Sequence, residues 1–289
     1  MTPFEAIRRL ETTLAAAGLT ESRIEAEALV MHVLGMNRTA LYMAWRDPIV
    51  SDEQRESLNA LGNRRLRREP LAYILGHREF YGLDFLVDER VLIPRPETEL
   101  LVDLALETAR SMDMAGALTV ADICTGSGAI AISLAINLPR AVVWATDISR
   151  DALEVASANA RLHGVEQRIH FAHGDLLVPL STQFDILVSN PPYVPKDILK
   201  ALEPEVLREP SLALDGGEQG LSVIRRLLTQ AARGLTDSGV FLMEFSPEQA
   251  EGIAGLAAIE FVGAQVGIVR DLAGMDRFLI VRTAHRARG

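Results

Sequence analysis

Residues Asp122-Ile123-Cys124-Thr125-Gly126-Ser127-Gly128 decide the fold of this chain. They follow an apolar run from Leu118 to Ile123 that is typical of a buried strand, and a helical pattern begins at Ala129. Gly126 and Gly128 allow a tight turn and let a ligand approach the backbone without a Cβ in the way. The stretch therefore predicts a strand, a nucleotide-binding turn and a helix.

Strand and helix patterns alternate on both sides of this turn. The last two apolar runs, Ala258 to Ile268 and Phe278 to Val281, are separated only by a turn, which predicts an antiparallel pair at one edge of the sheet. The whole region predicts a doubly wound, mostly parallel α/β sheet. Its other expected elements are helices at Thr98 to Ser111 and Ser149 to His163, and strands at Val142 to Thr146, Ile169 to Ala172, Phe184 to Val188 and Gly239 to Glu244.

The N-terminal region has a different pattern. Apolar residues recur at helical spacing from Pro3 to Leu75, and Ser51 with Gln54 forms a capping-box pattern. Phe80 to Phe85 and Phe85 to Ile93 alternate like the strands of a hairpin. We therefore expect a helical domain over 1–75, a β-hairpin linker over 76–96 and an α/β domain over 97–289.

Composition limits the functional classes. The formal net charge of −10 and the presence of only two lysines disfavour a large duplex DNA footprint. A single cysteine excludes an internal disulfide and a multi-cysteine zinc site, and the histidine spacing implies no metal. No apolar run is long enough to span a bilayer and the N-terminus lacks a signal-peptide layout, so we expect a cytoplasmic protein.

One basic cluster is the exception to the acidic composition. Arg64, Arg65, Arg67 and Arg68 crowd the end of a predicted helix. A solvated face that interacts favourably with the helix C-terminus is the preferred interpretation, and a docking patch is the alternative.

Two acidic residues follow the next predicted strands. Asp147 ends the strand after the glycine-rich turn, where a carboxylate can accept the hydroxyls of a ribose, although it can also cap the following helix. Asp175 can accept the amino group of an adenine or serve as a turn residue after Gly174. Gly126, Gly128 and Ala131 also fit a dinucleotide-binding motif, which by itself is weak.

Asn190-Pro191-Pro192-Tyr193 separates these alternatives. It follows the apolar run Phe184 to Val188 directly, so it lies at the carboxyl end of a core strand. The Asn190 side-chain oxygen and the Pro191 carbonyl can accept both hydrogens of one NH2 group, because prolines supply no competing N–H. The segment therefore predicts methyl transfer onto a planar nitrogen. A hydride-transfer enzyme has no evident use for these four residues.

Taken together, the glycine-rich turn, Asp147 and Asn190 to Tyr193 resemble the S-adenosyl-L-methionine-dependent class I methyltransferases that modify planar nitrogens. Further segments look like the HemK/PrmC family, the glutamine methyltransferases of peptide chain release factors. These segments are Arg78 to Phe80, Ile93 to Glu99, Glu209-Pro210, Ala213-Leu214, Gly216-Gly217 and Asp271 to Gly274.

The resemblance implies a seven-stranded sheet with an antiparallel edge strand, and a helical region that docks the substrate. It implies transfer of a methyl group from S-adenosyl-L-methionine, with S-adenosyl-L-homocysteine as product, to the glutamine of the Gly-Gly-Gln motif in class 1 release factors. Asn190, Pro191 and Tyr193 are then catalytic, and Pro192 joins them in binding the substrate. The cofactor residues are Asp122, Cys124, Thr125, Gly126, Ser127, Gly128, Asp147, Asp175, Leu176 and Asn190.

Three positions depart from the family pattern. Cys124 stands where many members have glycine, and we expect a negative φ there to accommodate its Cβ. Leu176 replaces a larger aromatic residue seen near the adenine in some relatives, and Ser246 stands where glycine is common.

Several alternatives stay open. A glutamine methyltransferase of a ribosomal protein uses the same chemistry, and a nucleic-acid amino-methyltransferase uses the same acceptor geometry on an exocyclic amine. A binding module without catalysis is a further class. The expected partner is a class 1 release factor, with no direct nucleic-acid contact, no membrane contact and a monomeric chain. Tyr193 can instead be an aromatic plug, and Glu97 and Glu99 can be helix-start acids.

Overall fold

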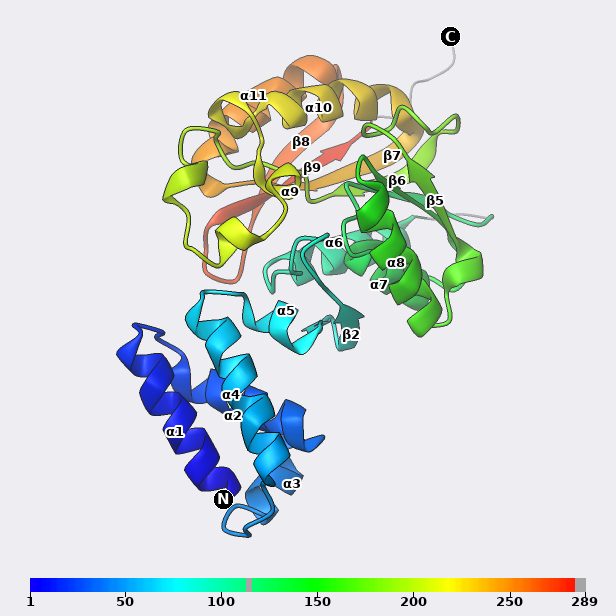
Figure 1. The fold of residues 1–289 in the computed structure, drawn as a ribbon. Coiled ribbons are helices and arrows are strands. Elements are labelled where there is room, and N and C mark those ends of the chain that lie inside the picture. Colours follow the sequence, from blue (N-terminus) through cyan, green and yellow to red (C-terminus); the bar gives the residue numbers. More distant parts are fainter. Residues whose placement is uncertain (113–115, 284–289) are drawn as a thin grey trace. The chain divides into compact units, whose positions relative to one another are not determined.

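The computed structural model of the protein describes residues 1–112 and 116–283, and Figure 1 shows its ribbon. The chain forms two compact units. The first consists of residues 1–76 together with 203–208, and the second of the described residues in 77–202 and 209–283. None of the described helices is long and apolar enough to cross a membrane.

The first unit is helical, as its apolar spacing predicts. Side chains of α1, α2, α3 and α4, among them Ile7, Leu29, Leu41 and Leu58, form its buried core. The capping box predicted from Ser51 and Gln54 is present at the start of α4, and Thr2 with Glu5 forms another at α1. Its helices are α1 (Pro3–Ala16), α2 (Ser22–Leu34), α3 (Arg38–Met43), α4 (Asp52–Leu66) and α5 (Leu71–Leu75).

Of the four arginines at the end of α4, Arg67 is exposed, Arg64 and Arg68 are half-buried, and Arg65 is buried. The guanidinium of Arg65 lies 2.8 and 2.9 Å from the two carboxylate oxygens of Glu25 and 2.8 Å from Glu205 Oε1. Arg68 also contacts Glu205, and Arg64 pairs with Glu69. The interpretation as a solvated face is therefore wrong for Arg65, because carboxylates from α2 and from 203–208 neutralise its charge inside the unit.

A short hairpin opens the second unit. Strand β1 (His77–Phe80) pairs antiparallel with β2 (Leu83–Leu86), and the turn lies at Tyr81 and Gly82, which both have positive φ. The predicted hairpin exists, but its strands are earlier and shorter than the alternation suggested. Residues 87–97 form an irregular segment held by Glu209, which is described below.

The main sheet has seven strands in the order β5-β4-β3-β6-β7-β9-β8, and neighbouring pairs are parallel except for β7–β9 and β8–β9. This confirms the doubly wound, mostly parallel sheet. The strands are β3 (Thr119–Ile123), β4 (Val142–Asp147), β5 (Ile169–His173), β6 (Phe184–Ser189), β7 (Leu235–Glu244), β8 (Gln265–Arg270) and β9 (Asp276–Arg282).

Both faces of the sheet are buried because alternate side chains face opposite layers. Val120, Ile186 and Leu242 belong to one apolar core, whereas their neighbours Leu187 and Phe241 belong to the other. Helices α6, α7 and α8 contribute to the first core and α10 and α11 to the second (Figure 1). These helices are α6 (Thr98–Ser111), α7 (Ala129–Asn137), α8 (Arg150–Leu162), α10 (Ser222–Gly234) and α11 (Ala250–Glu260), and a short helix α9 spans Ser211–Leu214.

The antiparallel pair predicted at the C-terminal edge is present, with one change. Residues 258–260 are the end of α11, so the outer strand begins only at Gln265. The apolar run Ala258 to Ile268 therefore contains a helix end, a turn and a strand. An apolar run does not by itself distinguish a buried helix end from a strand.

Candidate active site

The site lies where two parallel strands end side by side. Ile123 of β3 and Ser189 of β6 are register partners, and Ser189 Oγ donates to the Ile123 carbonyl at 2.6 Å. The strand order reverses between β3 and β6, which is the position where open α/β sheets bind ligands. The glycine-rich turn and the segment Asn190 to Tyr193 follow these two strands, so the fold brings both predicted motifs together.

Asp122, near the end of β3, stabilises the glycine-rich turn through hydrogen bonds to its side chain. Its side chain is fully buried, and its Oδ2 accepts hydrogen bonds from Thr125 Oγ1 at 2.6 Å and from the Ala131 backbone N–H at 3.1 Å. Its Oδ1 has no partner within the described chain. Burial raises the pKa of Asp122 to about 7 against the opposing effect of those two bonds.

Cys124 adopts the left-handed conformation with φ 64°, so the expectation of a negative φ is wrong. The turn requires this backbone geometry whichever side chain is present, and glycine meets it without cost. Leu176, which follows β5, is likewise left-handed with φ 53°. A left-handed non-glycine residue costs about 1–2 kcal/mol, and such strain clusters at ligand sites.

The Asp147 carboxylate accepts hydrogen bonds both from the glycine-rich turn and from the start of α8. Its Oδ2 accepts from the Gly126 backbone N–H and its Oδ1 from the Ser149 backbone N–H, both at 2.9 Å. Burial raises the pKa of Asp147, and these backbone donors act against that effect. Both carboxylate oxygens are therefore already used by the backbone, but each has a further lone pair with which it can accept from a ligand in the cavity that Asp147 lines.

Asn159 of α8 fixes the outer side of the same loop. Its fully buried carboxamide donates to the carbonyls of Ser127 and Leu86 at 2.9 and 3.0 Å and accepts from the Leu86 backbone N–H at 2.7 Å. One side chain thus ties the glycine-rich turn to strand β2.

The Asn190 carboxamide is held through its nitrogen. Its Nδ2 donates to Thr98 Oγ1 at 3.1 Å, and Thr98 Oγ1 donates to Glu244 Oε2 at 2.7 Å. Its Oδ1 has no hydrogen-bond partner among the residues described.

The backbone after Asn190 is joined to a distant segment. Val194 forms a parallel bridge with Asp215, accepts from the Gly216 N–H at 2.9 Å and donates to the Leu214 carbonyl at 2.9 Å. Gln249 Nε2 donates to the Tyr193 carbonyl at 3.0 Å. The segments 190–194 and 213–217 are therefore one structural element.

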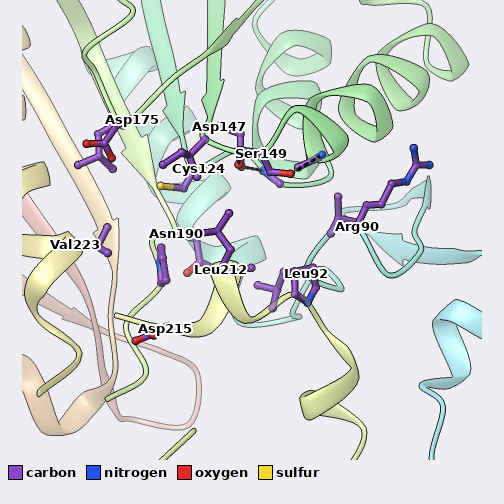
Figure 2. Close-up of a pocket in the computed structure, with 18 of the residues that line it drawn as sticks. Arg90, Leu92, Cys124, Asp147, Ser149, Asp175, Asn190, Leu212, Asp215 and Val223 are labelled. Carbon is purple, nitrogen blue, oxygen red and sulfur yellow. Dashed lines mark hydrogen bonds between the residues drawn. The ribbon is translucent and has the colours of Figure 1, made fainter. Parts of the chain in front are cut away.

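Two cavities open onto this element and share Leu92, Cys124, Gly126 and Asn190 in their walls. The larger encloses about 850 Å³, including its open mouth, and Figure 2 shows the residues around it. Of the predicted site residues it is lined by Cys124, Gly126, Asp147, Asp175, Leu176, Asn190 and Pro192. The smaller is lined by Thr125 and Ser127 in addition to the shared residues, and by Thr98, Pro94 and Arg95.

Four predicted residues line neither cavity. Asp122 lies beneath the turn, and a Cβ at Gly128 would lie 3.0 Å from Ile132 and 3.1 Å from Ala156, so Gly128 serves helix packing. Pro191 is buried, and the Tyr193 hydroxyl donates to Glu244 Oε1 at 3.2 Å. Burial raises the pKa of Tyr193, which keeps the phenol protonated as a donor.

The wall of the larger cavity fits an adenosine. Ile148, Leu176 and Val223 supply apolar surface for a flat ring, and Asp147 offers acceptors for hydroxyl groups. Gly126 has open space where a Cβ would be, so a ligand can contact the backbone there. Asp175 lines this cavity, but its carboxylate is ion-paired with Arg226 of α10, so an adenine amino group has to share that acceptor.

The remaining wall is the segment before α6. Glu209 is buried and accepts from the Ile93 backbone N–H at 3.0 Å, and it pairs with the Arg95 guanidinium. Glu99 accepts from the Tyr81 backbone N–H at 2.9 Å, which gives it a structural contact in the hairpin turn. Glu97 is exposed at the N-terminus of α6.

Known proteins share this combination of elements along nearly the whole chain. Residues 5–76 match the family model described as the PrmC N-terminal domain, and residues 98–210 match the methyltransferase small domain. A release factor glutamine methyltransferase of Deinococcus radiodurans is 40% identical over 271 residues, which cover 94% of this chain and 95% of that protein. The chain belongs to the release factor glutamine methyltransferase family. A member from Moorella thermoacetica is 42% identical over 280 residues, covering 96% of each chain.

Solved structures agree with this family assignment at the level of the fold. The ribosomal protein L11 methylase of Lactobacillus delbrueckii subsp. bulgaricus is 25% identical with a TM-score of 0.51, covering 69% of this chain and 84% of that one. A methyltransferase from Pyrococcus furiosus is 18% identical with a TM-score of 0.52, covering 77% and 98%. As a member of the release factor glutamine methyltransferase family, the protein is a methyltransferase that uses S-adenosyl-L-methionine.

Sequence reasoning gave no individual role to several residues that support this site. Asn159, Gln249 and Glu244 lie far along the chain from the loops that they hold, and only their placement by the sheet reveals their contacts. Thr98 and Glu209 lay within family-like segments but carried no chemical signal of their own. A charged residue at the end of an apolar run, as at Glu244 after Val240 to Met243, is the one local sign in the sequence.

Proposed function

We propose that this chain transfers the methyl group of S-adenosyl-L-methionine to the side-chain amide nitrogen of the glutamine in the Gly-Gly-Gln motif of class 1 release factors, acting as a cytoplasmic monomer. The observation that carries the proposal is the position of Asn190. It lines both cavities, and its nitrogen donates to Thr98 while its oxygen has no hydrogen-bond partner within the described part of the chain. That oxygen is suited to accept a hydrogen from a substrate NH2 group.

The donor supplies an electrophilic methyl group on a positively charged sulfur. Asp147 would hold the ribose hydroxyls, Asp175 and Leu176 the adenine, and the turn Cys124 to Gly128 the remainder, with Asp122 as support from below. Except for Asp122 and Gly128, the residues of this arrangement line the two cavities.

The chain's own residues would orient the acceptor amide. Asn190 Oδ1 and the Pro191 carbonyl would each accept one N–H of the glutamine side chain, with Pro192 and Tyr193 completing the substrate-binding loop. An amide nitrogen is a weak nucleophile, so orientation and fixed dipoles supply the main catalytic effect. As the nitrogen–carbon bond forms and the sulfur–carbon bond breaks, positive charge develops on the nitrogen next to those two acceptors. The nitrogen then loses one proton to solvent.

A transfer assay with labelled S-adenosyl-L-methionine tests the proposal. Purified protein is given a class 1 release factor, the same factor with the motif glutamine replaced by alanine, purified ribosomal proteins, or DNA. We expect label only in the intact release factor. Label in a ribosomal protein or in DNA with none in the release factor would support the corresponding alternative and overturn the proposal.

Donor binding separates an enzyme from a silent binding module. Calorimetry should show binding of S-adenosyl-L-homocysteine by the same preparation that transfers the methyl group. Binding without transfer to the release factor would leave only the binding module.

A further inference from the structure

Asn190 is the end of a buried polar chain that runs through three elements. Its Nδ2 donates to Thr98 Oγ1, at the start of α6, and Thr98 Oγ1 donates to Glu244 Oε2, at the end of β7. The distances are 3.1 and 2.7 Å. Thr98 is 4% exposed and Glu244 is 1% exposed, so water has little access to the bond between them.

The direction of each hydrogen bond follows from the group at the far end. The Thr98 hydroxyl donates its single hydrogen to Glu244 Oε2, the arrangement that an accepting carboxylate oxygen requires. The Thr98 oxygen is then left with lone pairs and can only accept from Asn190. The carboxamide of Asn190 must therefore present its NH2 group to Thr98 and its oxygen elsewhere.

Glu244 is itself held in this role by groups on other elements. The Tyr193 hydroxyl donates to Glu244 Oε1. Both carboxylate oxygens of Glu244 therefore accept a hydrogen bond. Burial raises the pKa of Glu244 above its ordinary value, and the bond from Thr98, the charge of Arg277 and the bond from Tyr193 oppose that rise only in part. A buried carboxylate costs stability, and groups of this kind cluster at functional sites.

We propose that Thr98 and Glu244 are positioning residues that fix the orientation of the Asn190 carboxamide, so that its oxygen faces the substrate amide. The proposal rests on the proposed function and extends it to residues that do not touch the reacting nitrogen. Without the chain, the carboxamide can rotate by a half turn and present NH2 to a substrate NH2, which is repulsive. Donor binding does not depend on this orientation, because Asp147 and the glycine-rich turn are held by other contacts.

Two substitutions at one position test the role of the hydroxyl. Thr98→Val keeps the branched shape and removes the oxygen, whereas Thr98→Ser keeps the oxygen and removes a methyl group. We expect Thr98→Val to lower kcat for release factor methylation by about 10- to 100-fold with the Kd for S-adenosyl-L-homocysteine changed less than twofold. Thr98→Ser should recover most of that loss. Thr108→Val, a buried threonine of the same helix outside both cavities, is the matched control and should leave kcat unchanged.

Glu244→Gln tests the direction of the chain, since an amide in this place can donate to Thr98 as well as accept. We expect a loss of kcat comparable to that in Thr98→Val. The double variant should lose little more than either single variant, because the two residues act as one unit.

A readout without turnover is also available in the protein alone. With selective ¹⁵N labelling of asparagine, the side-chain NH2 signal of Asn190 is identified by its absence in Asn190→Ala. Its exchange with solvent should accelerate in Thr98→Val and not in Thr98→Ser. Equal kcat and equal exchange in Thr98→Val and the active wild-type enzyme would overturn the positioning role. Absence of release factor methylation by the wild-type enzyme would instead overturn the proposed function.

Discussion

Ile123 and Ser189 end two adjacent parallel strands in register, and the Ser189 hydroxyl bonds to the Ile123 carbonyl. The residues that follow them, Cys124 and Asn190, consequently line the same two cavities. The sheet thus places the donor loop and the acceptor loop at neighbouring strand ends, although 66 positions separate the two register partners along the chain.

Replacing Asn190 with alanine tests the acceptor site. Asn190→Ala removes the oxygen proposed to hold the substrate amide, so we expect kcat for release factor methylation to fall by about 10²- to 10³-fold, the usual cost of losing one oriented polar contact in a transition state. Steady-state kinetics with labelled donor measure this. Binding of S-adenosyl-L-homocysteine should change by only a few fold, since the donor contacts other walls of the cavity.

Asn137→Ala is the control for that change. Asn137 lies at the end of α7, where its Nδ2 bonds to the Ser133 carbonyl, and it lines neither cavity. It should keep the wild-type kcat. An Asn190→Ala enzyme that turns over at the wild-type rate would contradict the proposed acceptor geometry.

The sequence pattern predicted most strands of the sheet, and it predicted that the glycine-rich turn and the segment Asn190 to Tyr193 each follow a strand. Alternation of apolar runs with helical spacing predicted β3 with its end at Ile123 and predicted β6 to Val188, one residue before its end at Ser189, because each buried strand is bounded by turn residues. The order of the strands did not follow from the pattern. Local periodicity carries no information on which strands become neighbours.

Contacts between residues far apart in the chain could not be predicted from the sequence for the same reason. Nothing near Thr98 indicates that its hydroxyl will meet Glu244, 146 positions away. The prediction for Cys124 was wrong. A negative φ was expected because it suits a residue with a Cβ, whereas the turn requires the left-handed conformation despite its energetic cost. The backbone geometry of the turn thus outweighs the preference of a non-glycine residue for negative φ.

Gly220 is required by the close approach of the loop after Asn190. A Cβ there would lie 2.1 Å from the Tyr193 carbonyl oxygen and 2.4 Å from Gln249 Nε2, and its φ is 71°. We expect Gly220→Ala to lower the free energy of unfolding by about 2–3 kcal/mol and kcat by more than tenfold, because the loop must move to accommodate the methyl group. Urea denaturation and the methylation assay measure the two effects.

Gly255 provides the matched comparison. It lies within α11, and a Cβ there meets nothing within 4 Å. Gly255→Ala should raise the free energy of unfolding by about 0.5–1 kcal/mol, as expected in a helix interior. If both alanine variants changed stability in the same direction, the close contact at Gly220 would not be the cause.

The left-handed residue at the glycine-rich turn makes a separate prediction. Cys124→Gly removes a backbone penalty of about 1–2 kcal/mol, but glycine adds flexibility to the unfolded chain and the packing of the thiol is lost. We therefore expect the free energy of unfolding to stay within about 0.5 kcal/mol of wild type. Cys124→Val, with a β-branched side chain at the same φ, should be about 1–2 kcal/mol less stable than Cys124→Gly. Equal stabilities of the two variants in urea would show that the backbone there is not constrained.

The raised pKa of Asp122 predicts a pH-dependent stability. Burial raises this pKa to about 7, whereas an aspartate in an unfolded chain titrates near pH 3.9. Between about pH 4 and pH 7 the folded protein therefore retains a proton that the unfolded chain has lost. The stabilising contribution of that proton is complete below about pH 4 and disappears as the pH rises through 7. Asp122→Asn cannot ionise, and its carboxamide oxygen can still accept from Thr125 and Ala131. Urea denaturation of both proteins from pH 5 to pH 8 should show the variant gaining stability relative to wild type as the pH rises. A difference that stays constant over this range would mean that Asp122 is ionised throughout it in the folded protein.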